Sequence, residues 1–249
     1  MINYLKSEYY RLVRKKSLYV VGAIGFSLII AAAFVLRYFG NNEIGFPYAS
    51  SQFFYLNVVS SGILILLIAL FYSGSLTGKD LAILKQSISF GISRQTIFWT
   101  KLMLTLGYFL VICAVGILLM IGLGESFFEH DPNATSSFLI ASVNMLPIIV
   151  SGFVVIHVLK ILRLGDAYVM FIALFIFTFS GTASRLLFKA VPGLDQLYRY
   201  MPSTLLENNM QDFMNYTVQL DIQFWLTGIL VAAIALLIGF GKFTKMDID

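Results

Sequence analysis

The chain has 249 residues, of which 59% are hydrophobic and 12% charged, and its mean hydropathy is +0.85. Soluble domains carry about 25% charged residues, so this composition excludes the soluble globular class and predicts a membrane protein with several spans. The net charge of +4 comes from 17 basic and 13 acidic residues, and their distribution along the chain is more informative than their sum.

Residues 1–16 form the first predicted element, a helix that lies in the plane of the membrane interface. Its apolar residues recur at helical spacing and share one face: Ile2, Leu5, Tyr9, Leu12 and Val13. Its basic residues lie largely on the other faces. This pattern is typical of an interfacial helix, and the same basic residues also help to set topology.

Six apolar runs follow, each about 20 residues or longer, which is enough to cross ~30 Å of hydrocarbon. They are predicted near 18–38, 53–76, 96–121, 138–160, 167–186 and 222–241. Aromatic residues mark many of their edges, as expected at the level of the lipid headgroups. The predicted fold class is therefore all-α: a single transmembrane domain over 1–249 with six membrane-spanning helices.

The segment 79–94, between the second and third runs, is predicted to form a short basic amphipathic helix on the cytoplasmic side. Its apolar positions recur at helical spacing, and its charged and polar residues lie between them. The candidate coupling residues are Lys79, Asp80, Leu81, Leu84, Lys85, Ile88, Gly91, Ile92 and Arg94. Gly91 offers a helix break, and Ser93 is a predicted N-cap for the next helix. Such a helix can lie on lipid headgroups or dock into a groove of a partner protein; we favour docking.

Residues 187–221 form the longest connection and are predicted to be external, before the last span. A connection of this length is usually functional or folded in its own right. We expect short helices that pack on the outer face or re-enter the membrane partway. The run Ser180-Gly181-Thr182, just before it, is a predicted bend in the fifth span.

The basic residues predict the orientation of the chain. The N-terminal segment, 77–101, the link 160–166 and the C-terminal tail together hold thirteen of the 17 basic residues, and these segments alternate with the acidic ones. The positive-inside rule therefore places both termini and the 79–94 segment in the cytoplasm.

Catalytic and metal-binding motifs are absent from the sequence. The run Gly74–Asp80 looks like a phosphate-binding loop, but three residues rather than four separate its glycines, and Asp follows the Lys. His130 and His157 are far apart, and Cys113 is the only cysteine, so neither a metal site nor a disulfide is expected. His157 is predicted to be a polar residue at a helix–helix contact.

Ionisable residues are predicted only near the ends of the spans. Lys101, Lys160 and Arg185 occupy such positions, where long side chains can reach the interface. Ion-coupled transporters and cation channels usually need charges within the membrane, so the sequence disfavours both classes.

Four features of the chain resemble the permease subunits of ABC-2 type ABC transporters, especially small bacterial ones that move antimicrobial peptides. The N-terminal interfacial helix runs directly into the first span, and a long re-entrant region precedes the last one. Between the second and third spans stand Leu84-Lys85, then Gly91-Ile92-Ser93-Arg94, then Lys101, and the chain ends with Lys-Met-Asp-Ile at 245–248. One departure is clear: Ala82-Ile83 stands where relatives often have Gly-Thr.

The resemblance implies a permease without catalytic residues, metal or cofactor of its own. A separate ATPase subunit, with ATP and Mg, would bind the cytoplasmic face, and 79–94 would be the coupling helix in its groove. A second permease subunit, identical or different, would complete the pathway in a bacterial cell membrane. The expected cargo is an amphipathic or antimicrobial peptide, exported or cleared from the membrane, with lipid as the surrounding partner and no nucleic acid.

Two other classes remain as alternatives from the residues alone. One is an intramembrane enzyme such as a protease, which the missing catalytic constellation disfavours. The other is a channel or structural membrane protein, for which a cytoplasmic docking helix has no obvious use.

Overall fold

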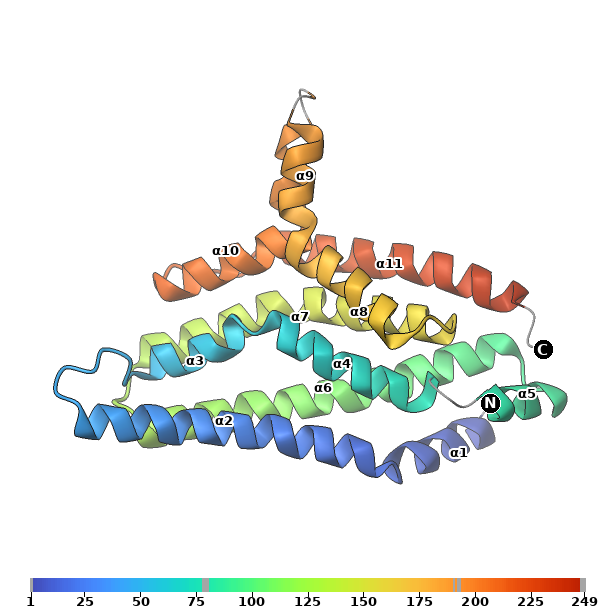
Figure 1. Cartoon of the computed structure of the whole chain (residues 1–249), viewed down its shortest axis with the longest axis horizontal. Helices are drawn as coiled ribbons and strands as arrows, with labels where there is room; N and C mark the ends of the chain where they lie inside the picture. The colour runs from blue at the N-terminus through green and yellow to red at the C-terminus, as the bar shows by residue number, and fades with distance from the viewer. Residues whose placement is uncertain (1, 78–80, 190, 192–193, 247–249) are drawn as a thin grey trace.

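The computed structural model describes residues 2–77, 81–189, 191 and 194–246, and it is all-helical within them, with no strand. Most of the helices run roughly along one axis and form an elongated bundle (Figure 1). In chain order the elements are α1 (Ile2–Val13), α2 (Lys16–Asn42), α3 (Ser51–Val59), α4 (Gly62–Thr77), α5 (Leu81–Ser89), α6 (Arg94–Phe127), α7 (Pro132–Ile161), α8 (Asp166–Leu174), the π-helical stretch η1 (Phe175–Phe179), α9 (Ser180–Phe188), the 3₁₀ helix η2 (Asp195–Tyr200), α10 (Pro202–Met214) and α11 (Ile222–Lys245).

Five stretches in the described part of the chain are long and apolar enough to cross a membrane, which indicates a multi-pass membrane protein. They are α2, α6, α7, the run from α8 to α9, and α11. The predicted second span, 53–76, is not one straight helix: α3 and α4 meet at an angle of 51° and pass the same test only as a bent pair.

Polar side chains at the junction of α3 and α4 account for the bend. Asn57 Nδ2 donates to the carbonyl of Phe53 at 3.1 Å, and Ser60 Oγ donates to the carbonyl of Leu56 at 2.8 Å. Ser61 Oγ donates in the same way to Asn57. Side chains that bond back to helix carbonyls compete with the backbone ladder and bend helices, so the break lies between Asn57 and Gly62, where Ser60, Ser61 and Gly62 are consecutive.

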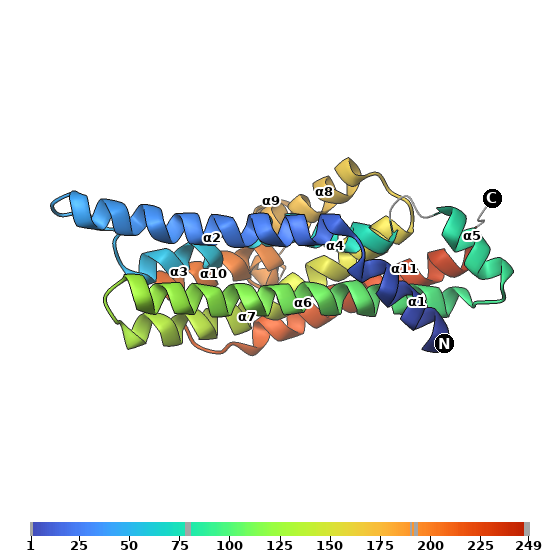
Figure 2. The same ribbon diagram turned by 90° about the horizontal axis from the view of Figure 1, so that it is seen from below.

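Helix α7 is the centre of the bundle. Two-thirds (67%) of its most apolar window is buried, against 11–28% in the other four candidate spans. It packs on α11 and α4 and also touches α3, α6, α8 and α10, and Figure 2 shows it running beside α6 along the molecule. The other spans therefore leave most of their apolar surface facing outward, as lipid-facing helices do.

Small residues allow α7 and α11 to approach closely. A Cβ atom added to Gly228 would lie 2.5 Å from the carbonyl oxygen of Pro147, and one added to Gly239 would lie 2.3 Å from Val158 Cγ1. Gly152 likewise allows α7 to approach α4 closely, because a Cβ there would lie 2.4 Å from Leu66 Cδ2. Glycine at such positions is a common device for helix packing in membranes.

Replacing Gly228 with Ala is expected to destabilise the bundle, because the clash is with backbone atoms of α7 that cannot rotate away. Overpacking of this kind costs about 1–3 kcal/mol. The matched control is Gly241→Ala on the same helix, where no atom lies within 4 Å of the added Cβ. Thermal unfolding of the detergent-solubilised protein measures both, and equal midpoints for the two variants would contradict the packing described here.

The N-terminus, α5 and the C-terminal end of α11 lie together at one end of the bundle (Figure 1). The turn between α7 and α8, where Arg163 has a positive φ of 67°, lies at the same end. Lys160 at this turn pairs with Asp166. The segments that the sequence predicts to share one side of the membrane are thus brought to one end.

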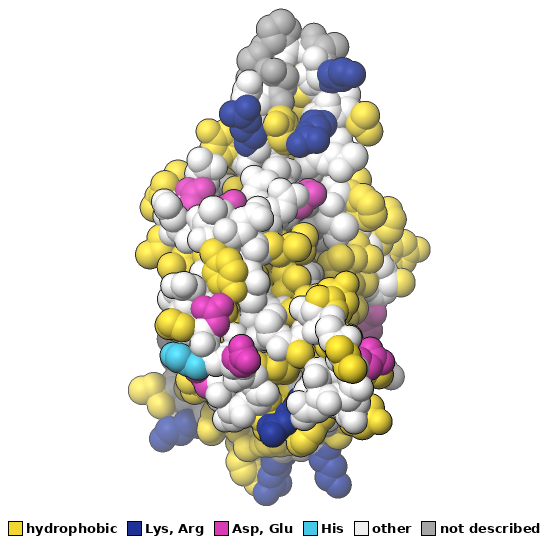
Figure 3. All heavy atoms as spheres, turned by 90° about the vertical axis from the view of Figure 1, so that its left-hand side faces the viewer, with side chains coloured by type: hydrophobic (Ala, Val, Ile, Leu, Met, Phe, Trp, Pro, Cys, Tyr) yellow, Lys and Arg dark blue, Asp and Glu magenta, His cyan; other side chains and the backbone are white. Residues whose placement is uncertain are grey.

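The opposite end of the bundle carries a group of acidic side chains (Figure 3). In the described part of this end, Asp131 caps α7 by accepting from the backbone N–H of Asn133 at 3.0 Å. It also accepts a hydrogen bond from Tyr216 Oη at 2.7 Å. Burial of Tyr216, and then this bond to the Asp131 carboxylate, raise the pKa of Tyr216 to about 12. The Tyr216 bond is the main reason that the pKa of Asp131 is lowered.

Candidate functional site at the end that carries both termini

Helix α5 and the turn after it follow the predicted pattern closely. The helix ends at Ser89, and Gly91 adopts a positive φ of 79°, a conformation that glycine adopts without strain. The backbone N–H of Ile92 donates to the carbonyl of Ser87 at 3.1 Å. Ser93 then caps α6, because its Oγ accepts from the backbone N–H of Thr96 at 3.2 Å. The predicted break and N-cap are confirmed.

The apolar face of α5 is turned toward the protein itself rather than toward a partner. Leu84 is buried, with 8% of its surface exposed, and Ile88 and Ile92 are half-buried against the core. In this conformation Leu84 packs within its own chain, so the role predicted for it in a groove of another subunit stays a prediction. Leu81 lies in α5, but its side chain is outside the description, and Lys79 and Asp80 lie outside the described residues altogether.

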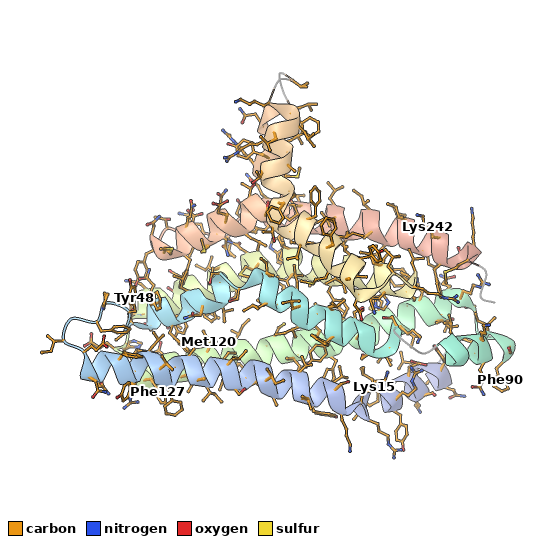
Figure 4. All side chains as sticks on the ribbon, in the orientation of Figure 1. Lys15, Tyr48, Phe90, Met120, Phe127 and Lys242 are labelled. Carbon is orange, nitrogen blue, oxygen red and sulfur yellow. The ribbon has the colours of Figure 1, made fainter. Side chains whose placement is uncertain are left out.

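The described side chains that α5 and its turn present to the outside include Lys85, Gln86, Ser89 and Phe90. Phe90 has 77% of its surface exposed, and Figure 4 shows it at the far tip of this end of the molecule. The helical-spacing argument missed Phe90, because it lies after the last turn of α5. An aromatic residue directly before the turn glycine was the available signal.

Arg94, one of the predicted coupling residues, forms hydrogen bonds within the chain. Its Nη1 donates to the carbonyl of Thr244 at 3.0 Å, and also to Phe243 and Met246. The last carbonyls of a helix have no partner within the helix, so Arg94 satisfies the end of α11 and fixes it to the start of α6.

A buried ion pair joins α1 to α6, and no pattern in the sequence predicts it. Lys101 Nζ lies 3.8 Å from Glu8 Oε2, and both side chains are at least 97% buried. Lys101 also donates to the carbonyl of Leu76 at the end of α4. Lys101 therefore points into the bundle and does not extend to the interface as predicted. Arg11, one helical turn beyond Glu8, donates to Glu8 Oε1 at 2.7 Å.

Glu8 lies on a face of α1 different from the predicted apolar one. Tyr4, Glu8 and Leu12 face the protein, whereas Ile2, Leu5 and Tyr9 are exposed. An exposed apolar stripe on a helix at the end of the bundle fits an interfacial position. The inward face carries the chemistry that joins α1 to the bundle.

Tyr4 links this pair to α5. Its burial, and then the neighbouring Glu8 carboxylate, raise the pKa of the Tyr4 phenol, while a hydrogen bond with Ser87 on α5 acts in the opposite direction. A cavity of about 350 Å³ opens beside these groups between α1 and α5. Its walls are Asn3, Tyr4, Ser7, Glu8, Arg11, Gln86, Ser87, Phe90 and Ile92.

His157 lies deeper in the same half of the bundle and is fully buried. Its Nδ1 is 3.4 Å from Ser73 Oγ on α4, and its ring packs against Phe98 and Phe153. The prediction that it is a polar residue at a helix–helix contact is confirmed.

No protein-family model, curated protein or solved structure matches the chain. The functional assignment therefore depends on the arrangement of this end of the bundle and on the resemblance in the 79–94 segment.

Proposed function

We propose that the protein is the permease subunit of an ABC-2 type transporter, with ATP and Mg bound by a separate ATPase subunit. The observation that carries this proposal is α5: a short helix between two spans, at the end that holds both termini, bonded to α1 and with an exposed tip. If ATP is hydrolysed by another chain, the membrane spans need a surface on which that chain can dock, and the exposed tip of α5 offers one.

The docking surface that we propose differs from the apolar face expected from the sequence. It consists of Lys85 and Phe90 together with the rim of the cavity between α1 and α5. An exposed aromatic anchor next to a cavity is typical of the few residues that dominate binding energy. Lys85 contributes at the rim, where charges affect association rate more than affinity.

Phe90→Asp is expected to abolish co-purification of the proposed ATPase subunit, while Lys85→Glu weakens it less. Tyr10→Asp, which changes an exposed aromatic residue of α1 outside the cavity, is the matched control. Affinity capture of the ATPase is compared at equal amounts of membrane-inserted permease. Full recovery of the ATPase with Phe90→Asp would reject this docking surface. If no ATPase co-purifies with the unchanged chain, the proposed function itself fails.

The proposed topology has six spans in a bacterial cell membrane, with α3 and α4 together forming the second span and both termini in the cytoplasm. The concentration of basic residues in the segments at one end supports this orientation. A cysteine at exposed Gln86, in a Cys113→Ser background, is expected to resist an impermeant thiol reagent until the cells are opened. Labelling of this cysteine in intact cells would contradict the proposed orientation and place α5 outside the cell.

The proposed cargo is an amphipathic or antimicrobial peptide. Support comes from the outward-facing surfaces of α2 and α11, which carry aliphatic and aromatic residues, since a small ionic substrate would need charged side chains along its path. Deletion of the gene is expected to raise sensitivity to some members of a panel of cationic amphipathic peptides. Unchanged sensitivity across the panel would remove the support for peptides.

A further inference from the structure

The hairpin formed by α9 and η2 leaves the bundle sideways. Figure 1 shows α9 standing away from the other helices near the middle of the long axis, not at either end. The base of the hairpin is firmly bonded: the backbone N–H of Gly181 donates to Ser203 Oγ at 2.8 Å, and Thr227 Oγ1 of α11 donates to the carbonyl of Tyr200 at 3.1 Å.

The described side chains of the hairpin include three exposed cations, Arg185, Lys189 and Arg199, whereas the side chain of Asp195, the first residue of η2, is outside the description. The guanidinium of Arg185 lies 4.1 Å from the centre of the Tyr198 ring. Among the side chains that the structure describes, which do not include Asp195, no carboxylate lies within ion-pair distance of these three cations.

The depth of the hairpin follows from the helix that leads to it. The fourteen residues from Asp166 to Phe179 rise about 1.5 Å each, which is ~21 Å along the helix, and less across the membrane because α8 runs obliquely (Figure 1). The hydrocarbon layer is about 30 Å thick. The hairpin therefore leaves at hydrocarbon depth, where cations that face lipid are costly.

Helix α10 offers the complementary charge next to this hairpin. It packs against α9 and η2, and Glu207 and Asp212 lie on its exposed face. The polar residues Asn208 and Gln211 share that face. One surface of the chain thus holds a basic projection and an acidic stripe side by side, both outside the apolar pattern of a lipid-facing surface.

We propose that the α9–η2 hairpin docks on α10 of a second copy of this chain, with its three cations facing Glu207 and Asp212 of that copy. A two-fold axis makes the contact reciprocal, so each copy gives its hairpin and receives the other's. Pairing removes the three cations from lipid. This inference rests on the proposed function, which requires a second permease subunit. It adds that the second subunit is a copy of this chain and names the surface through which the two copies pair.

Crosslinking between two differently tagged copies tests the contact in membranes that contain no ATPase. A negative result would therefore reject the pairing of the two copies without bearing on whether an ATPase docks. In a Cys113→Ser background, one copy carries Leu186→Cys and the other Asn208→Cys, which keeps all five charges. We expect a mixed-tag product with a short bis-maleimide. The control pair replaces Leu186→Cys with Leu28→Cys on α2, another exposed position. Yields equal to this control would overturn the proposal.

Charge reversal in the same assay tests the pairing itself. Glu207→Lys in both copies is expected to lower the mixed-tag product at least about tenfold, since like charges at an interface are strongly unfavourable. Adding Arg185→Glu to the same chains should restore it. Unchanged crosslinking in Glu207→Lys, or no recovery in the double variant when both chains insert normally, would overturn the assigned contact.

Discussion

Lys101→Met is expected to destabilise the protein by roughly 3–5 kcal/mol, which is the usual cost of removing one partner of a buried ion pair. Glu8 would then keep only Arg11 as the cation bonded to it in the described structure, in a site with 2% of its surface exposed. The carbonyl of Leu76 would lose the ammonium that it accepts from. The midpoint of thermal unfolding in detergent measures the change.

The double variant Glu8→Gln with Lys101→Met separates the ion pair from simple loss of packing. Removing both charges leaves no uncompensated ion, so the double variant is expected to be less destabilised than the sum of the two single variants. Lys85→Met, which changes an exposed lysine of α5, is the control and should be near neutral. Strict additivity of the single changes would show that Glu8 and Lys101 do not act as a pair.

The effect should extend beyond stability to the neighbouring cavity. Glu8 lines the cavity between α1 and α5, and Lys101 supports Glu8 from behind. If the proposed docking surface is right, variants that remain folded should still bind the ATPase less well, because α1 loses its fixed position against α5.

Local signals in the sequence predicted the helical segments and their junctions well. Gly91 and Ser93 act through backbone conformation and hydrogen bonds to adjacent residues, so their roles can be read without knowing the fold. The apolar runs likewise predicted the all-helical class, because length and hydropathy alone determine whether a helix can cross the bilayer. The polar residues Asn57, Ser60 and Ser61 indicate the bend between α3 and α4, but hydropathy averaged over a window of the length of a span does not detect them.

Contacts between distant segments could not be predicted in the same way. From the sequence alone, Glu8 is one more polar residue of an interfacial helix. Its partner Lys101 lies 93 positions away in the sequence and is adjacent only in the folded chain. Leu84 shows helical apolar spacing, yet spacing cannot say whether that face meets its own chain or a partner. Arg94 binds the end of α11, and the side chain that remains exposed, Phe90, falls outside the periodic pattern.

A second buried network, at the other end of the bundle, predicts the other large effect. Asn144 and Asn209 have 2% and 1% of their surfaces exposed. Asn144 Nδ2 donates to Asn209 Oδ1 at 3.2 Å and to the carbonyl of Gln219 at 2.8 Å, and its Oδ1 accepts from the backbone N–H of Asp221 at 3.2 Å. One amide on α7 thus holds α10 and the residue that caps α11.

Asn144→Leu is expected to leave these partners without hydrogen bonds in a buried site, and each such group costs about 1–3 kcal/mol. Asp221 caps α11 by accepting from the backbone N–H of Gln223. Loss of its bond to Asn144 should therefore also make the connection 215–221 more mobile. Limited proteolysis should therefore cut this connection faster, and the thermal midpoint should fall. Asn208→Leu, an exposed neighbour in α10, is the control. In the Asn144→Leu background, adding Asn209→Leu should lower the stability by less than Asn209→Leu does in the unchanged chain, since the hydrogen bond between the two amides is already lost. Proteolysis at the unchanged rate would mean that α10 and the start of α11 are held by apolar packing, with the amide network contributing little.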